Sequence, residues 1–216
     1  MELTPTIYKW FSDFAAIQCG ADVLRRRLVV IAGPSGAGKS VLASALTAAD
    51  PTYVILRNYT TRAARRTNHS GHFAYLSDEG FLEAQTDRQF VLSRLAPRPR
   101  YGYKVEELTA VLAAGGRPVL LFRHSGTKYL SDCLGGVPTV FIEGEPALVA
   151  SHSRNTESPP SAEDVRNTIC ANRQLQEVML KEGWPCLHIM NHYLGEAELD
   201  AIAQTVREFL SVADRP

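Results

Sequence analysis

The stretch Gly33-Pro34-Ser35-Gly36-Ala37-Gly38-Lys39-Ser40 decides the fold, because it matches the phosphate-binding loop pattern G-x-x-x-x-G-K-[ST]. Residues 28–32 before it are Leu-Val-Val-Ile-Ala, an apolar, largely β-branched run typical of a buried parallel strand. Residues 41–46 after it favour a helix. A strand, a glycine-rich loop and a helix in that order are the context that gives the motif its meaning.

The residue types in this loop suit the binding of phosphate groups. Glycines let backbone N–H groups approach phosphate oxygens without a Cβ in the way, and the following helix adds its positive end. Lys39 supplies a mobile positive charge for the β- and γ-phosphates, and the Ser40 hydroxyl is placed to bind Mg²⁺. The sequence therefore predicts a nucleoside triphosphate site, and a chance match is disfavoured by the two correct flanks. The residues expected to form it are Gly33, Ser35, Gly36, Ala37, Gly38, Lys39, Ser40 and Val41.

Length and composition fit one soluble domain. The chain has 216 residues, 45% of them apolar and 21% charged, as is ordinary for a globular protein. Lys and Arg total 23, as do Asp and Glu, so the chain has no net charge that would favour binding to nucleic acid or to an acidic membrane. The four cysteines are scattered without C-x-x-C spacing, which favours free thiols in a reducing compartment. No apolar run approaches the ~20 residues of a membrane span, and the start lacks a secretory signal. We expect a cytoplasmic protein without nucleic-acid or membrane partners.

Residues 1–27 precede the first predicted strand and form an extension. Apolar side chains recur there at roughly helical spacing, which predicts one amphipathic helix or two short ones broken near Gly20. These side chains belong to Ile7, Trp10, Phe11, Phe14, Ile17, Val23 and Leu24. We expect the extension to pack over an exposed flank of the domain. A homodimer interface is the alternative, because three aromatic residues on one face are a large apolar surface.

Strands and helices alternate along residues 28–216, which predicts an α/β domain with a parallel sheet and helices on both faces. Residues 90–93 are expected to form a short strand, and residues 94–103 an arginine- and tyrosine-rich loop. A buried strand at 118–122 delivers Arg123 and His124 at its carboxyl end, where ligands of open α/β sheets bind.

Residues 58–66 bring three arginines close to two hydroxyl side chains. Arginine at that density beside a nucleotide site is suited to holding a second phosphate group through bidentate hydrogen bonds. A solvated basic loop is the alternative.

The whole series resembles the guanylate kinase branch of the nucleoside monophosphate kinases. The resemblance rests on the phosphate loop, on Thr-Thr-Arg-Ala-Ala-Arg at 60–65, on Phe-Ala-Tyr-Leu-Ser at 73–77 and on Tyr101-Gly102. It implies a P-loop NTPase fold with an acceptor-binding insertion at about 58–104 and a lid at about 151–161, with ATP and Mg²⁺ as cofactors. It further implies that Arg62, Arg65, Phe73 and Tyr101 hold the phosphate of a small-molecule acceptor. The position of Arg123 and His124 at the end of a buried strand makes them further candidates for substrate binding. Phe73 stands where the family has tyrosine.

The base-reading positions of that family differ here. Leu92 stands in place of a glutamate that accepts from guanine, Tyr103 in place of a serine or threonine, and Phe122 and His124 in place of a D-x-D pair. The segment from Phe90 through Tyr101-Gly102 resembles ribose 1,5-bisphosphate phosphokinases of phosphonate utilisation, which also carry Leu-Ser at the glutamate position. We therefore expect ATP-dependent transfer to ribose 1,5-bisphosphate, giving phosphoribosyl diphosphate. The alternative is a guanylate kinase or another nucleoside monophosphate kinase with altered base choice.

Kinases of this type close an arginine-bearing lid over the transferring phosphoryl group, where the arginines neutralise charge. Here the pattern is reduced to Arg154, followed by Arg166 and Arg173, which are seven residues apart on one helix and so share a face. The expected catalytic residues are Lys39, Arg154 and Arg166. The reduced lid leaves a third alternative, a nucleotide-binding regulatory module without turnover.

Overall fold

The computed structural model describes residues 9–14, 17, 20–64, 71–96, 98–153, 159–193 and 195–213. Its centre is a parallel sheet in the order β10-β9-β2-β8-β3. These strands are β2 (Val29–Ala32), β3 (Tyr53–Ile55), β8 (Arg117–Phe122), β9 (Thr139–Glu143) and β10 (Cys186–Met190). All four residues of β2 are buried, as its apolar run predicts for a strand covered on both faces.

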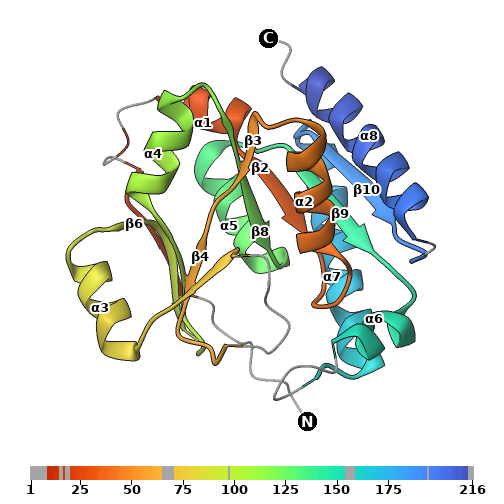
Figure 1. Cartoon of the computed structure of the whole chain (residues 1–216), viewed down its shortest axis with the longest axis horizontal. Helices are drawn as coiled ribbons and strands as arrows, with labels where there is room; N and C mark the ends of the chain where they lie inside the picture. Colours follow the sequence, from red (N-terminus) through yellow and green to blue (C-terminus); the bar gives the residue numbers. More distant parts are fainter. Residues whose placement is uncertain are drawn as a thin grey trace.

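Helices cover both faces of this sheet, which confirms the predicted α/β class (Figure 1). One face packs on α2 (Lys39–Ala49) and α8 (Glu196–Ala213), through Leu42 and Val206 among others. The other packs on α1 (Ala21–Arg27), α4 (Val105–Ala113), α5 (His124–Leu134) and the end of α7 (Ala162–Lys181). The short helix α6 (Pro146–His152) follows β9. One apolar cluster is buried on each face of the sheet. As a result, β2 lies between two layers of helices, which hold it and the loop that follows it in place.

A second sheet, with the order β1-β6-β7-β4-β5, stands beside the predicted parallel sheet. Its members are β1 (Lys9–Ser12), β4 (Asn58–Thr60), β5 (Phe73–Tyr75), β6 (Phe90–Ala96) and β7 (Tyr101–Lys104), and α3 (Asp78–Thr86) lies between β5 and β6. All its pairs are antiparallel except β4 with β5. The expected loop at 94–103 is wrong over most of its length, because Arg94 pairs with Tyr101 and Ser93 with Gly102 across a hairpin.

The prediction of a wholly helical extension is also wrong. Residues 9–12 form β1, which pairs antiparallel with the edge of β6, and the Asp13 N–H extends the pairing to the Val91 carbonyl at 3.0 Å. Only α1, at 21–27, is helical as expected. Apolar spacing fits both a helix and an irregular strand here, and the unpaired edge of β6 decides for the strand. Ile17 is 6% exposed in the core, so the extension packs on its own domain.

The two longest helices are amphipathic rather than apolar throughout. α7 begins at a capping box in which Ser161 and Asp164 bond to each other's backbone N–H, and it buries Val165, Ile169 and Met179 on one face. Among the described residues, none of the helices has both the length and the apolar character that crossing a membrane requires.

Candidate active site

The phosphate loop lies at the carboxyl end of β2, between β8 and β9. Its conformation depends on glycine: φ is +88° at Gly36 and +96° at Gly38, in the left-handed region that other residues rarely adopt. A Cβ at Gly33 would lie 2.3 Å from the Ile142 carbonyl oxygen, and one at Gly36 would lie 2.4 Å from that of Val149. The loop therefore packs directly against the end of β9 and against α6.

Lys39 and Ser40 occupy the first two positions of α2, directly after the loop. The Lys39 Nζ donates to the carbonyl oxygens of Gly33 and Pro34 at 2.8 and 2.7 Å, so its ammonium group lies over the loop. Ala37 is fully buried, whereas the Val41 side chain is largely exposed. A glycine cradle with a lysine over it and a helix N-terminus beneath it fits the phosphates of a nucleotide.

The residues present also fit a phosphate-bound Mg²⁺. Ser40 provides a hydroxyl at the helix start, and Mg²⁺ bound to phosphates usually keeps several waters and needs few protein ligands. Within the described ranges, no group of three or more His, Cys, Asp or Glu side chains is placed to hold a metal ion.

Two residues of the β10–α8 connection form hydrogen bonds to the phosphate loop, and neither was predicted from the sequence. The Asn191 amide donates to the Ala37 carbonyl at 3.1 Å, and the Tyr193 hydroxyl donates to the Gly36 carbonyl at 2.8 Å. The Tyr193 ring also meets the His152 ring edge-on at the end of α6, with centroids 4.4 Å apart. Their position just after the last parallel strand was the available signal, because ligand sites of open sheets lie at that edge.

In the segment that follows β4 of the second sheet, the Arg62 guanidinium lies on aromatic rings. The Arg62 Cζ lies 3.9 Å from the centroid of the Phe73 ring and 6.0 Å from that of Tyr75. Its Nε and Nη2 atoms are buried and make no hydrogen bond among the described residues. Buried donors without partners are costly, so a ligand that supplies acceptors would be a chemically suitable partner for this group.

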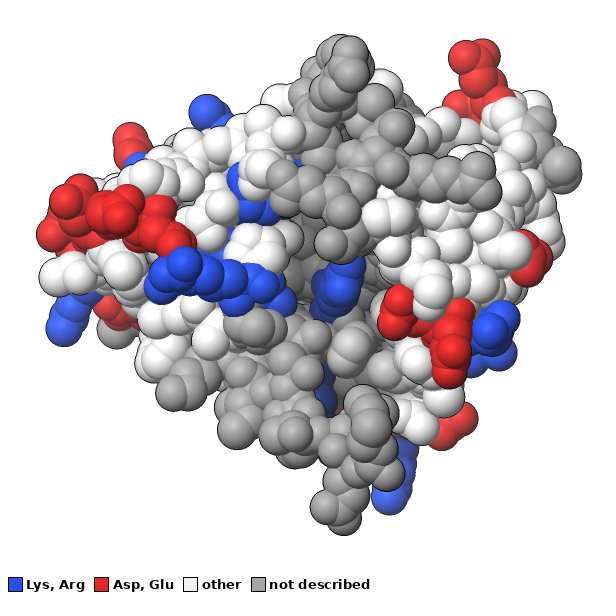
Figure 2. Space-filling view, turned by 90° about the horizontal axis from the view of Figure 1, so that it is seen from below, with Lys and Arg blue, Asp and Glu red and all other residues white. Residues whose placement is uncertain are grey.

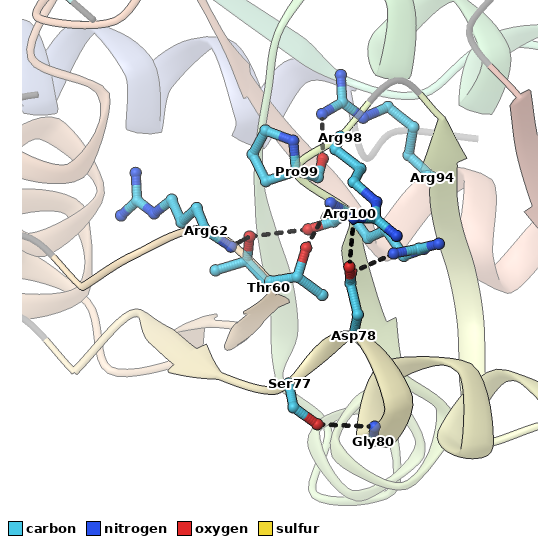
Figure 3. A network of polar contacts seen from close by, with 10 residues as sticks. Thr60, Arg62, Ser77, Asp78, Gly80, Arg94, Arg98, Pro99 and Arg100 are labelled. Carbon is cyan, nitrogen blue, oxygen red and sulfur yellow. Dashed lines mark hydrogen bonds and ion pairs between the residues drawn. The ribbon is translucent and has the colours of Figure 1, made fainter. Parts of the chain in front are cut away.

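The β4 end that carries Arg62 is fastened to the β6–β7 hairpin (Figure 3). The Thr60 hydroxyl accepts from the Arg62 N–H at 3.2 Å and donates to the Arg100 carbonyl at 2.8 Å. Arg98 and Arg100 both pair with the Asp78 carboxylate at the start of α3, Arg98 at 2.8 Å. Both arginines therefore brace the hairpin against α3 and turn away from Arg62 in Figure 3.

One pair of facing residues on β6 and β7, referred to as the Leu92–Tyr103 row, is buried and mostly apolar. Leu92 pairs with Tyr103, and both are 1% exposed in the main core. The Tyr103 hydroxyl donates to the Leu121 carbonyl at 2.9 Å and accepts from the Asn58 amide at 3.0 Å, which ties the two sheets together. Burial raises the pKa of this phenol well above its ordinary value. Tyr103 is thus committed to the fold and offers little to a ligand.

Comparison with known proteins gives the affiliation of the chain. The guanylate kinase family model matches residues 25–211. A guanylate kinase of Pseudomonas fluorescens is 30% identical over 64% of this chain and 67% of its own length. One of Methylobacillus flagellatus is 26% identical over 70% of this chain and 75% of its own. The crystal structure of guanylate kinase from Anaplasma phagocytophilum shares the fold, with a TM-score of 0.57 at 19% identity over 88% of this chain and 86% of that one.

The chain belongs to the guanylate kinase family. It is accordingly an ATP-dependent kinase with the P-loop NTPase fold that the resemblance implied. Of the positions that the guanylate kinase resemblance singled out, Arg65 in the acceptor segment and Arg154 in the lid lie outside the described residues.

The remaining expected site residues lie at the carboxyl edge of the sheet or on α7. Arg123 is the exposed N-cap of α5, and His124 follows it. Burial, with a smaller contribution from the Arg123 charge, lowers the pKa of His124, which favours the neutral ring at neutral pH. Arg166 and Arg173 line one cavity of about 790 Å³ beside α6, so the prediction that they share a helix face is confirmed. Arg173 donates to the fully buried Glu143 carboxylate at 3.0 and 3.2 Å.

Figure 2 shows one face of the molecule, which has a hollow in its middle. Seen from below, basic side chains lie around the hollowed middle of this face, and acidic ones lie towards its edges. A neutral chain therefore presents a locally positive centre, which favours anionic ligands.

Proposed function

We propose that this protein transfers the γ-phosphoryl group of Mg²⁺-bound ATP to a phosphate group of a small phosphorylated acceptor. The observation that carries the acceptor part is Arg62, whose guanidinium lies on the Phe73 ring and has two buried nitrogen atoms without a hydrogen-bond partner among the described residues. Such a group recognises a phosphate through charge-assisted, bidentate hydrogen bonds. Membership of the guanylate kinase family supports the donor part.

The roles of the residues follow from their charge and placement. The phosphate loop and α2 hold the donor phosphates, with Lys39 neutralising charge on the β- and γ-phosphates and Ser40 binding Mg²⁺. Phosphoryl transfer needs little covalent help from the protein, so positioning and charge neutralisation provide most of the rate enhancement. Arg166 on α7 and Arg154 in the lid are proposed to neutralise charge on the transferring group.

The comparisons favour a nucleoside monophosphate as acceptor, since the relatives named above are guanylate kinases. The buried Leu92–Tyr103 row argues for a base choice other than guanine, because this row offers no carboxylate to the donor groups of the guanine edge. A site that leaves hydrogen-bonding groups of a ligand unpaired loses several orders of magnitude in discrimination.

A second candidate acceptor is ribose 1,5-bisphosphate, which would give phosphoribosyl diphosphate. The same Leu92–Tyr103 row favours it, because an acceptor without a base needs no partner there.

The test is a coupled ATP-consumption assay with nucleoside monophosphates, ribose 5-phosphate and ribose 1,5-bisphosphate, with the products identified by mass spectrometry. We expect transfer to at least one acceptor and weak use of GMP. A kcat/KM for GMP in the ordinary enzyme range of ~10⁴–10⁸ M⁻¹s⁻¹ would contradict the altered base choice. ATP binding without transfer to any acceptor would favour a regulatory module instead.

A further inference from the structure

We propose that Arg94 forms a second anion subsite on the acceptor-binding face of the small sheet, so that the acceptor carries two anionic groups. One group would bind at Arg62, which is stacked on Phe73, and the other at Arg94, which is stacked on Tyr101. This inference rests on the proposed phosphoryl transfer and specifies the chemical class of its acceptor.

The strand register places these residues on one face. Arg94 on β6 pairs with Tyr101 on β7, Tyr101 pairs with Thr60 on β4, and Thr60 pairs with Tyr75 on β5. Residues directly opposite one another in a sheet point to the same side. Phe73 lies two residues from Tyr75 and therefore shares that side, and Arg62 folds back over both rings. The row thus has a guanidinium near each end and aromatic rings between them.

The Arg94 guanidinium is held in place rather than mobile. Its Cζ lies 4.7 Å from the centroid of the Tyr101 ring, and its Nη2 donates to the Pro99 carbonyl at 2.6 Å. An arginine stacked on a ring and tied by a hydrogen bond has lost much of its freedom already, so ligand binding costs less entropy. Arg94 lies two residues along β6 from Leu92, which pairs with Tyr103 in the buried Leu92–Tyr103 row. A nucleobase bound there would need polar partners.

The other two arginines of the hairpin, Arg98 and Arg100, form ion pairs instead. Arg98 and Arg100 pair with Asp78, and the Arg100 side chain is only 12% exposed. In Figure 3, the Arg94 guanidinium lies on the far side of Pro99 from Asp78. Of the three arginines in this hairpin, Arg94 is thus the one on the acceptor side, and Arg98 provides a control of equal charge in the same segment.

The spacing of the strands whose rings carry the two guanidinium groups suits a small bisphosphate. Arg94 lies on the ring of Tyr101 in β7 and Arg62 on the ring of Phe73 in β5, and only β4 lies between these strands. Two inter-strand steps of ~4.8 Å separate the strand backbones by about 10 Å. A single phosphate group cannot reach across that distance, whereas two phosphates on one sugar can approach both ends of the row.

The test measures binding, so that it does not depend on turnover. The full-length protein is saturated with Mg²⁺ and a non-hydrolysable ATP analogue, which occupies the phosphate loop. Ribose 5-phosphate and ribose 1,5-bisphosphate are then titrated calorimetrically into wild type, Arg94→Gln and Arg98→Gln. We expect Arg94→Gln to weaken bisphosphate binding by about 10- to 150-fold, the loss of one charge-assisted contact, while ribose 5-phosphate binding changes little. Arg98→Gln should alter neither affinity.

Arg94→Lys guards against a folding effect, because it keeps the charge and loses the planar fork; it should recover part of the bisphosphate affinity. Equal losses for both sugars, no loss for either, or no preference of the wild type for the bisphosphate would overturn the subsite. Failure of the kinase assay with every acceptor, alongside an intact Arg94-dependent preference, would refute the proposed function and leave the subsite standing.

Discussion

The Tyr193 hydroxyl donates a 2.8 Å hydrogen bond to the carbonyl oxygen of Gly36, at the middle of the phosphate loop. Tyr193 has a φ of +61°, a conformation that costs energy for a bulky residue. Gly144 makes room for its ring, since a Cβ there would lie 2.9 Å from the Tyr193 Cε2. Burial raises the pKa of Tyr193 to about 12, so the hydroxyl keeps its proton throughout the neutral range. The ring thus joins the end of α6, through His152, to the phosphate loop.

Tyr193→Phe should therefore weaken nucleotide binding without unfolding the protein. The ring and its contact with His152 remain, and one hydrogen bond of about 0.5–1.5 kcal/mol is lost, which corresponds to roughly 2- to 13-fold in affinity. Calorimetric titration of the non-hydrolysable ATP analogue measures the change. Tyr129→Phe is the matched control, because that hydroxyl contacts Ser12 of β1 instead of the loop. An equal change in both variants would show that the Tyr193 hydroxyl has no specific role in nucleotide binding.

Lys39→Ala should reduce turnover by several orders of magnitude and leave the fold intact. The substitution removes the positive charge proposed to stabilise the β- and γ-phosphates during transfer. The Lys39 Nζ bonds to two carbonyls of the phosphate loop itself, and Asn191 and Tyr193 hold the same loop, so circular dichroism and thermal unfolding should change little. A purified variant that transfers phosphate at nearly the wild-type rate would refute the role of Lys39.

The contrast between the two sheets shows what the sequence could and could not predict. The β2–loop–α2 unit was predictable because it is local: an apolar run, glycines with positive φ and a helix start within about twenty residues. The second sheet depends on pairing between distant segments, such as β1 with β6, and such pairing leaves only a weak trace in either segment. Asn191 and Tyr193 were missed for the same reason, since they contact a loop about 155 residues earlier in the chain. The resemblance assigned Arg62 and Phe73 to one site, but it did not predict that the guanidinium lies on the ring, which only the fold reveals.

Gly36→Ala should abolish nucleotide binding, because a side chain at this position distorts the phosphate loop. The residue has a φ of +88°, and the new Cβ would lie 2.4 Å from the Val149 carbonyl oxygen and 2.5 Å from the Ser153 Oγ. The left-handed conformation alone costs ~1–2 kcal/mol, and the loop must also shift away from α6. Fluorescence titration of a labelled ATP analogue measures binding, and thermal unfolding measures stability. Gly20→Ala is the control, because its Cβ meets nothing within 4 Å and its φ is −61°. Nucleotide affinity close to wild type in Gly36→Ala would mean that the loop tolerates the shift.

Arg62→Ala should impair use of the acceptor while leaving ATP binding almost unchanged, which separates the two halves of the site. The guanidinium lies on Phe73 in the small sheet, whereas the donor loop follows β2 in the parallel sheet. One charge-assisted contact to a phosphate is worth about 1.5–3 kcal/mol, so kcat/KM for the acceptor should fall roughly 10- to 150-fold. Arg62→Lys should recover only part of the loss, because an ammonium keeps the charge without the bidentate fork. Arg57→Ala serves as control, since Arg57 pairs with Glu107 of α4 instead. Equal losses in ATP affinity and acceptor use would assign Arg62 to the donor site, and no loss in either would make it part of a solvated basic surface.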